Sequence, residues 1–333
     1  MNVKPEQCRR TPSSRALNVA LLGECMIEMR GDAFSGISQT FGGDTLNAAV
    51  YLSRVTPAGR ICADYITAIG ADSFSDAMRQ SWRDEGLGDH HVRVIEDALP
   101  GLYFIQTDPQ GERRFLYWRG EAAARRMFDG PEAGAVLHAL ADYDYIYLSG
   151  ISLAILTASG RARLMHALRL AREAGARIVF DNNYRPHLWP DAHAARQAYG
   201  EMLRLTDLAL ITWEDDAALF GYADTEALFH AYAGFGVGEV AVKRGVASCL
   251  IQCASGRFDV PAEQVPHVVD TTAAGDSFSA AYLSCRLQGG DPPLAARWGH
   301  RLAAQVVQHR GALIPGAAMP SLDMPSYSSA VEA

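Results

Sequence analysis

Lysine is nearly absent from this chain of 333 residues. Only Lys4 and Lys243 occur, and the other strongly basic side chains are arginines. Neither lysine follows a glycine, so the Gly-Lys-Ser/Thr core of a Walker A phosphate loop is missing. A bound phosphate group would therefore need another device, such as the free N–H groups at the start of a helix.

Long apolar runs are lacking as well. No stretch reaches the roughly 18 apolar residues of a membrane-spanning helix. The opening MNVKPEQCRRTPSSR has no apolar core, so we expect residues 1–16 to be a loose tail and not a secretory signal. The cysteines lack zinc-ligand spacing, which favours reduced thiols in a cytoplasmic protein without a membrane partner. They are Cys8, Cys25, Cys62, Cys249, Cys253 and Cys285.

A positive net charge is the third absence. The chain carries a formal charge of −8, which predicts no nucleic-acid partner. Small anionic ligands are still compatible with this charge, because the local charges of a site hold them.

Short apolar runs alternate with helical patterns through most of the chain. Strands are expected at 17–22, 63–72, 144–150, 176–186, 207–213 and 238–245, and helices at 41–55, 73–86, 159–175, 213–221, 276–290 and 292–311. This order predicts one α/β domain over 17–315, with a mostly parallel sheet flanked by helices and a loose tail over 316–333. Residues 99–119 interrupt the order, because two β-rich segments flank the turn sequence DPQGE and predict a hairpin.

Polar residues gather where the expected strands end. Asp181, Asn183 and Arg185 follow one strand, and Lys243 to Gly245 end another. Ligands of parallel sheets bind at the carboxyl ends of their strands. These residues are therefore expected to meet at one site.

The stretch DTTAAGDSFSAAYL (270–283) begins a late helix with very small residues and an acid. Asp276 could simply cap this helix. Alternatively, the small side chains could let backbone N–H groups reach an anion, beside which Asp276 acts as a base. The other strand-end residues favour the second interpretation.

Three short segments are similar to motifs of other protein classes. VAVK (240–243) is like the lysine strand of protein kinases, but the further motifs of that class are missing. The sequence GDS (275–277) leaves an esterase with Ser277 as nucleophile as an alternative, although no histidine and acid stand at a suggestive spacing. The adjacent acids at 215 and 216 give only a weak metal prediction.

DTTAAGD late in an α/β chain, together with GGDTLNAAV (42–50), resembles the ribokinase-like (PfkB) carbohydrate kinases over roughly residues 17–315. Within that family, seven segments are similar to the members that phosphorylate 2-keto-3-deoxy-D-gluconate (KDG). They are GECMIE, FGGDTLN, LPGLYFIQTD, YWRGEAAA, LSGISLAIL, DNNYRPHLW and DTTAAGDSFSAAYL.

The resemblance implies a ribokinase-like fold with a small β lid, which includes residues 99–119 and joins two subunits as a homodimer or larger homo-oligomer. It implies transfer of phosphate from ATP, with Mg²⁺, to the 6-hydroxyl of KDG in sugar-acid catabolism of the hexuronate and Entner–Doudoroff type. The resemblance leaves open whether the reaction also needs a monovalent cation. A fructokinase-like activity, the esterase and a catalytically silent sugar-binding protein are the alternatives.

The resemblance also implies a role for each matched residue. Asp276 is the expected base, and the N–H groups of Ala273, Ala274, Gly275 and Asp276 form the expected anion hole. The expected sugar contacts are Gly43, Asp44, Asn47, Tyr103, Tyr117, Arg119 and Arg185. The expected nucleotide contacts are Asn183, Arg185, Lys243, Arg244, Gly245, Ala273 and Gly275.

Two positions depart from the family pattern. Ala273 stands where the family commonly has glycine, and an alanine suffices there if its φ is negative, which we therefore expect. The Asn-x-x-Glu motif of the family is TWED (212–215) here, so Thr212 and Asp215 are expected to reach Mg²⁺ through a water.

Overall fold

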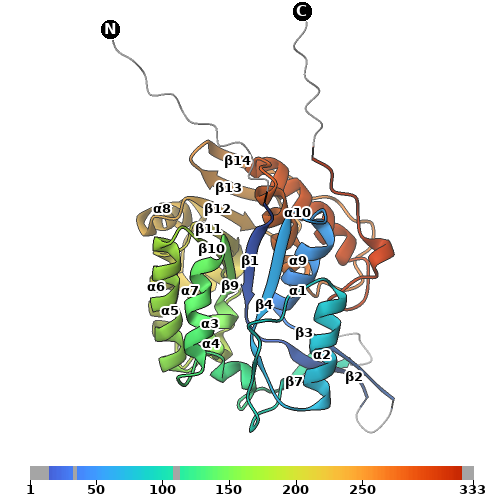
Figure 1. Ribbon diagram of the computed structural model, residues 1–333. Coiled ribbons are helices and arrows are strands. Elements are labelled where there is room, and N and C mark those ends of the chain that lie inside the picture. Colours follow the sequence, from blue (N-terminus) through green and yellow to red (C-terminus); the bar gives the residue numbers. More distant parts are fainter. Residues whose placement is uncertain (1–14, 33–35, 108–112, 325–333) are drawn as a thin grey trace, which may run out of the picture.

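A mostly parallel sheet forms the centre of the molecule (Figure 1), whose computed structural model describes residues 15–32, 36–107 and 113–324. In these ranges eight strands follow the order β14-β13-β12-β11-β10-β9-β1-β4. Only β13 and β14 among them run antiparallel to their neighbours. The strands are β1 (Leu17–Leu22), β4 (Ile61–Ile66), β9 (Tyr145–Ser149), β10 (Arg177–Asp181), β11 (Leu208–Thr212), β12 (Glu239–Lys243), β13 (Cys249–Cys253) and β14 (Gly256–Val260). The predicted α/β class is confirmed.

Helices cover both faces of this sheet (Figure 1). One face carries α3 (Ala133–Ala139), α4 (Gly150–Ile155), α5 (Ala158–Glu173), α6 (Ala192–Leu203), α7 (Trp213–Phe220) and α8 (Thr225–Phe235). The other carries α1 (Asp44–Val55), α2 (Ser73–Asp84), α9 (Ala274–Leu287) and α10 (Pro292–Val306). Short 3₁₀ turns lie at Ala123–Arg126, Leu140–Asp142, Pro186–Leu188 and Gly316–Ala318.

The apolar run of β1 shows why its sequence has no polar alternation. Val19 and Leu21 belong to one core cluster, whereas Ala20 and Leu22 belong to the cluster on the opposite face. Successive side chains of a strand point to opposite faces. A strand covered on both faces must therefore be apolar throughout.

A second, smaller sheet, separate from the central one, contains the expected hairpin and is called the lid below (Figure 1). Within the described residues it has the order β3-β2-β7-β8. The expected hairpin supplies β7 (Gly101–Thr107) and β8 (Arg113–Trp118), while its turn at 108–112 lies outside the described residues. Strands β2 (Met26–Gly31) and β3 (Ile37–Gly42) were not among the expected strands. They form the other half of the lid and are inserted between β1 and α1.

Two further boundaries differ from the expectation. The strand expected at 63–72 is divided into β4 and the two-residue β5 (Ala68–Ile69), which pairs with β6 (Arg93–Val94). Residues 316–324 are not a loose tail, since Met319, Leu322 and Met324 pack against the core cluster beneath α9 and α10. The expected N-terminal tail lies almost wholly outside the described residues.

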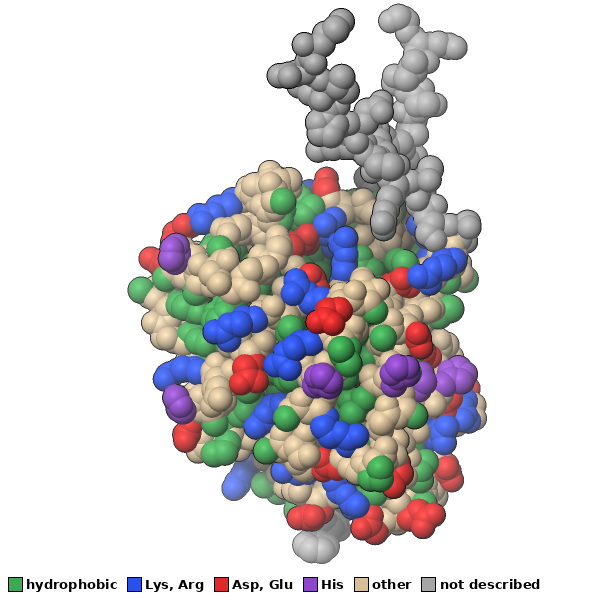
Figure 2. Space-filling model, turned by 60° about the vertical axis from the view of Figure 1, so that its left-hand side comes forward, with side chains coloured by type: hydrophobic (Ala, Val, Ile, Leu, Met, Phe, Trp, Pro, Cys, Tyr) green, Lys and Arg blue, Asp and Glu red, His purple; other side chains and the backbone are tan. Residues whose placement is uncertain are grey.

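The surface carries charges of both signs. On the face drawn in Figure 2, basic and acidic side chains of the described residues are interspersed. None of the helices in the described ranges is both long and apolar enough to cross a membrane.

Candidate functional site

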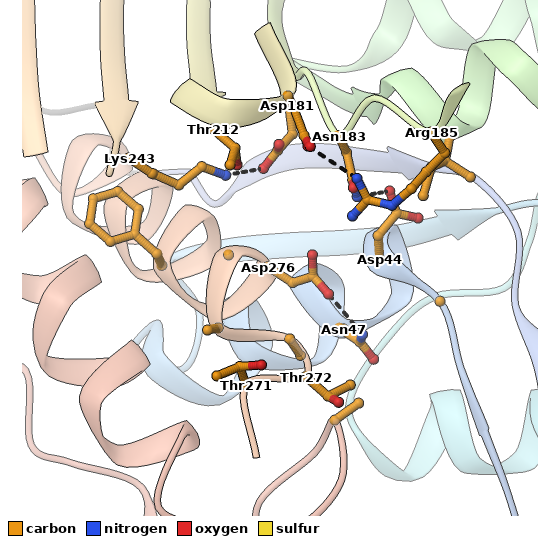
Figure 3. A pocket seen from close by; sticks show the side chains of 18 of the residues that line it. Asp44, Asn47, Asp181, Asn183, Arg185, Thr212, Lys243, Thr271, Thr272 and Asp276 are labelled. Carbon is orange, nitrogen blue, oxygen red and sulfur yellow. Dashed lines mark hydrogen bonds and ion pairs between the residues drawn. The ribbon is translucent and has the colours of Figure 1, made fainter. Parts of the chain in front are cut away.

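The ends of three neighbouring strands open into one cavity. Asp181 ends β10, Thr212 ends β11 and Lys243 ends β12, and all three line a cavity of about 770 Å³. The start of α9, seen in Figure 3, and the lid complete its wall. Every residue expected at the site lines this cavity: Gly43, Asp44, Asn47, Tyr103, Tyr117, Arg119, Asn183, Arg185, Asp215, Lys243, Arg244, Gly245, Ala273, Ala274, Gly275 and Asp276.

Asp276 does not cap its helix. The N-cap position of α9 is Ala273, and no side chain makes a cap hydrogen bond there. The Asp276 carboxylate instead accepts a hydrogen bond of 2.8 Å from Nδ2 of Asn47 in α1 (Figure 3). The helix-cap interpretation is therefore wrong, and the carboxylate is held toward the cavity from a neighbouring helix.

The turn before α9 leaves backbone N–H groups available. The Ala274 N–H donates to the carbonyl of Thr271 at 3.2 Å. Within the described residues, no backbone oxygen accepts from the N–H groups of Ala273, Gly275 or Asp276. Free N–H groups at a helix start attract an anion, and the helix dipole adds to this attraction.

Ala273 has a different backbone conformation from the one expected. Its φ is +60° and its ψ is 13°, in the left-handed region. The expectation of a negative φ is wrong, because the chain turns sharply here to enter α9. An alanine in this region is less stable than a glycine by roughly 1–2 kcal/mol.

Burial and a second carboxylate act on the proton affinity of Asp276. Removal from bulk water raises the pKa of Asp276, and the negative charge of Asp44 raises it further. The hydrogen bond from Asn47 and the charge of Lys243 act in the opposite direction. A base with a raised pKa is suited to accept a proton near neutral pH.

Asn183 and Arg185 reach the cavity from the loop after β10. Asn183 has a φ of 30°, and its Nδ2 donates to Asp44 at 2.7 Å. Arg185 forms an ion pair of 3.1 Å with Asp215 at the start of α7. These contacts place an amide, a cation and two carboxylates along the same wall.

The lid residues are held by acids that the sequence analysis did not select. Arg119 is ion-paired with the buried Glu24, and the Tyr103 hydroxyl donates to the buried Glu28. Nε of Arg119 and Oδ1 of Asn47 have no hydrogen-bond partner in the described part of the chain. Unpaired buried polar atoms are costly, so a polar ligand beside them would lower the free energy.

His187 joins the body of the protein to the lid. Its ring stacks on Tyr117 with the centroids 5.9 Å apart, and both side chains line the cavity. Glu24, Glu28 and His187 lie in segments that resemble the family, GECMIE and DNNYRPHLW, but their contacts could not be predicted because their partners are distant in the chain.

Lys243, Arg244 and Gly245 differ in the contacts that they already make within the protein. Lys243 is buried and ion-paired with Asp181 at 2.8 Å. Arg244 binds the carbonyl of Ser248 at 2.9 Å, and Gly245 has a φ of 58° in the turn that follows β12. All three line the cavity, at the side formed by the end of β12.

The acids at 215 and 216 do not form a joint metal site. Asp216 is fully buried and accepts hydrogen bonds from Asn182 and Tyr232, away from the cavity. Across the described residues, no group of three or more His, Cys, Asp or Glu side chains is arranged to hold a metal ion. From the TWED motif, Thr212, Glu214 and Asp215 line the cavity, which fits a metal ion held mainly by a ligand and water.

The esterase alternative fails at its nucleophile. Ser277 is fully buried, and its hydroxyl donates to the carbonyl of Ala274 at 2.9 Å. A serine nucleophile must be reachable and bonded to a base. Nε2 of His300 lies 3.1 Å from the carbonyl of Val260 and is not bonded to this serine.

Comparisons with known proteins show which family this chain is similar to. Residues 16–318 match the model of the pfkB family carbohydrate kinases. The chain is 48% identical over 307 residues to a 2-dehydro-3-deoxygluconokinase of Dickeya dadantii, covering 91% of this chain and 99% of that protein. It is 46% identical over 306 residues to a 2-dehydro-3-deoxygluconokinase of Escherichia coli, covering 91% and 99%. The crystal structure of an Escherichia coli protein in complex with ATP and Mg²⁺ is similar to this chain, with a TM-score of 0.76 and 23% sequence identity. The similarity covers 89% of this chain and 94% of that protein's chain.

Proposed function

We propose that this chain, which belongs to the pfkB family of carbohydrate kinases, transfers the γ-phosphoryl group of ATP to the 6-hydroxyl of 2-dehydro-3-deoxy-D-gluconate (KDG). The products are ADP and the 6-phosphate of the sugar acid. Relatives that are 40–48% identical over most of their length carry the name of this activity. The single structural observation that carries the proposal is the Asp276 carboxylate beside the free N–H groups at the start of α9.

The reaction needs little more than positioning and stabilisation of charge. The 6-hydroxyl of the sugar lies against Asp276, which takes its proton as the oxygen attacks the γ-phosphorus. The bond from this phosphorus to the bridging oxygen breaks, and ADP leaves with the electron pair. The N–H groups of Ala273, Gly275 and Asp276 face the phosphoryl oxygens and stabilise their charge.

ATP would occupy the side of the cavity formed by the end of β12. Lys243 to Gly245 lie there, next to the turn at 271–276. Thr212 and Asp215 would face the metal ion of the nucleotide through water, and Mg²⁺ bound there would neutralise phosphate charge. Asp215 has only Arg185 as an ion-pair partner within the described residues.

The sugar acid would occupy the side beneath the lid. Asp44 and Asn47 from α1 offer polar partners for hydroxyl groups, and Tyr103 and Tyr117 cover them from the lid. Arg119 and Arg185 lie at the same end and supply the cationic partner that a carboxylate requires. We place the carboxylate between these two side chains.

Release of ADP tests the proposal directly. Purified protein with Mg²⁺-ATP should release ADP with KDG, and much less with fructose at the same concentration. Turnover of fructose equal to that of KDG would favour a fructokinase. Binding of KDG without release of ADP would favour a silent sugar-binding protein.

A further inference from the structure

The expected role of Lys243 as a border of the nucleotide site leaves its burial unexplained. Its side chain is only 9% exposed, although it ends a strand at the open cavity. Nζ donates to Oδ2 of Asp181 at 2.8 Å and to Oγ of Ser279 at 3.1 Å. Burying an ion pair costs several kcal/mol of desolvation per charge, so stability alone is a weak reason for this arrangement.

The pair is tied to the helix that carries the proposed base. Ser279 follows Asp276 by three residues in α9, and its hydroxyl also donates to Oδ2 of Asp181, at 2.6 Å. The Tyr147 hydroxyl donates to the same oxygen at 3.3 Å. Three donors therefore fix this carboxylate, and the carboxylate and Ser279 fix the ammonium.

One N–H donor of the Lys243 ammonium has no partner among the described residues. A lysine has three N–H donors, and within the described residues Nζ makes the two hydrogen bonds already given. A Cβ built on Gly275 would lie 3.7 Å from Nζ, so the ammonium is next to the turn that offers the free N–H groups. Both residues line the cavity, and Figure 3 shows the lysine reaching from the end of its strand toward α9.

We propose that Lys243 is a catalytic residue whose third N–H donates to the γ-phosphoryl group while it is transferred, with Asp181 and Ser279 holding the ammonium at that place. This inference rests on the proposed kinase activity and adds a fixed positive charge to the backbone N–H groups. As the phosphorus–oxygen bond to ADP breaks and the bond to the sugar oxygen forms, negative charge on the phosphoryl oxygens meets this ammonium. The proton of the sugar still goes to Asp276.

The test separates this role from a structural ion pair. Lys243→Met alone would leave Asp181 buried without its partner, so the informative variant is Lys243→Met with Asp181→Asn, which removes both charges. We expect the double variant to fold and its kcat to fall by about 10²–10³-fold, the usual loss when one preorganised donor is removed. A double variant with the thermal stability and the kcat of the wild type would overturn the proposal.

A matched control lies between the same two elements. Glu239 at the start of β12 and Arg286 in α9 form an ion pair of 2.8 Å outside the cavity. Glu239→Gln with Arg286→Met removes a comparable pair and should leave kcat unchanged. An equal loss of kcat in both double variants would mean that only the packing of β12 against α9 matters, which would overturn the proposal.

Nucleotide binding gives a second readout that needs no sugar. Calorimetry of the Lys243 double variant should show weaker binding of ATP and unchanged binding of ADP, because the third donor meets only the γ-phosphate. Equal weakening of both nucleotides would overturn the proposal. If the wild type binds ATP but never phosphorylates KDG, the proposed function fails while this measurement still tests Lys243.

Lys243→Gln replaces the double variant if the latter does not fold. This substitution keeps two donors toward Asp181 and Ser279, and the same changes in kcat and in nucleotide binding are expected.

Discussion

Asn47 of α1 donates to the carboxylate of Asp276 in α9 across 2.8 Å, although the two residues are 229 positions apart. The bond holds the side chain of the proposed base toward the cavity and away from the N–H groups of its own helix. It also joins the early and the late motif of the sequence in one site.

Replacing Asp276 by asparagine should separate catalysis from folding. Asp276→Asn keeps the shape but cannot accept the proton, so kcat should fall by at least about 10²-fold. Binding of KDG and the thermal unfolding temperature should stay close to the wild-type values. Asp291 is the matched control, because it caps α10 by accepting from the Leu294 N–H at 2.7 Å. Asp291→Ala should lower stability by about 1 kcal/mol and leave kcat unchanged. Near-normal turnover in a folded Asp276→Asn variant would contradict the assignment.

The pH dependence should reveal the carboxylate next to the base. Asp276 works only when it is deprotonated, and burial together with the charge of Asp44 raises its pKa. Therefore kcat/KM should begin to fall with decreasing pH well above about 4, the ordinary range of an aspartate. Asp44→Asn removes the neighbouring charge, so the acid limb of the kcat/KM profile should move to lower pH. This shift is expected even if the variant also changes the maximal kcat/KM. Asp215→Asn serves as the control and should leave the limb in place. A limb that ignores the Asp44 change would contradict this account.

Substitutions at Ala273 and Ala274 should have opposite effects on stability. Ala273 has a φ of +60°, so Ala273→Gly relieves strain and should raise the free energy of unfolding by up to about 1 kcal/mol. Ala274 begins α9, and Ala274→Gly should lower that free energy by about 0.5–1 kcal/mol. Ala273→Val should lower both stability and kcat, since a β-branched residue is strongly disfavoured at positive φ. Thermal unfolding with steady-state kinetics measures all three, and equal stability changes at both positions would argue against the strained turn.

The two arginines beneath the lid should account for preference toward a sugar acid. A hydrogen bond to a charged group is worth about 1.5–3 kcal/mol, or roughly 10- to 150-fold in affinity. Arg119→Met or Arg185→Met should weaken the binding of KDG by this factor and leave the affinity for ATP unchanged. Each variant should also lower the ratio of activity with KDG to activity with fructose. Arg172→Met removes a surface arginine that pairs with Asp207 at 3.2 Å and should change neither. If both cavity variants keep the wild-type ratio of KDG to fructose, the carboxylate is bound elsewhere.

The outer face of the lid should form a subunit contact. Phe115 and Tyr117 line the cavity, so Trp118 faces the other side of the sheet, where it is 61% exposed. An exposed tryptophan on a small sheet favours a partner surface. Trp118→Lys should shift the protein toward monomer in sedimentation velocity, whereas Leu170→Lys on the distant α5 should not. A wild type that is monomeric at micromolar concentration and fully active would refute the contact.

The order of strands and helices could be predicted from the sequence for a physical reason. Buried parallel strands such as β1 and β9 must be apolar on both faces, and amphipathic helices separate them. Their carboxyl ends share one edge of the sheet, so residues such as Asp181 and Lys243 could be expected together from the sequence alone.

Other features depend on contacts that local patterns do not encode. Burial in β2 and β3 runs in blocks, with the first three residues of β2 buried and the first four of β3 exposed, so their sequences show no alternating period. The positive φ of Ala273 arises from the turn into α9 and not from the residue itself. Glu24 acquires its importance only from Arg119, which lies 95 positions later.

Strand β2 pairs in parallel with β7, and the bond from Tyr103 to Glu28 bridges 75 positions of the chain. Parallel pairing of distant segments gains nothing until the intervening loop has closed, which makes it intrinsically slow. The intervening segment includes α1, β4 and α2, which belong to the body of the protein. During folding, the body can thus become compact while the lid is still open, and its strand edges are then exposed to other chains. Catalytic competence would be the last property that the folding chain acquires.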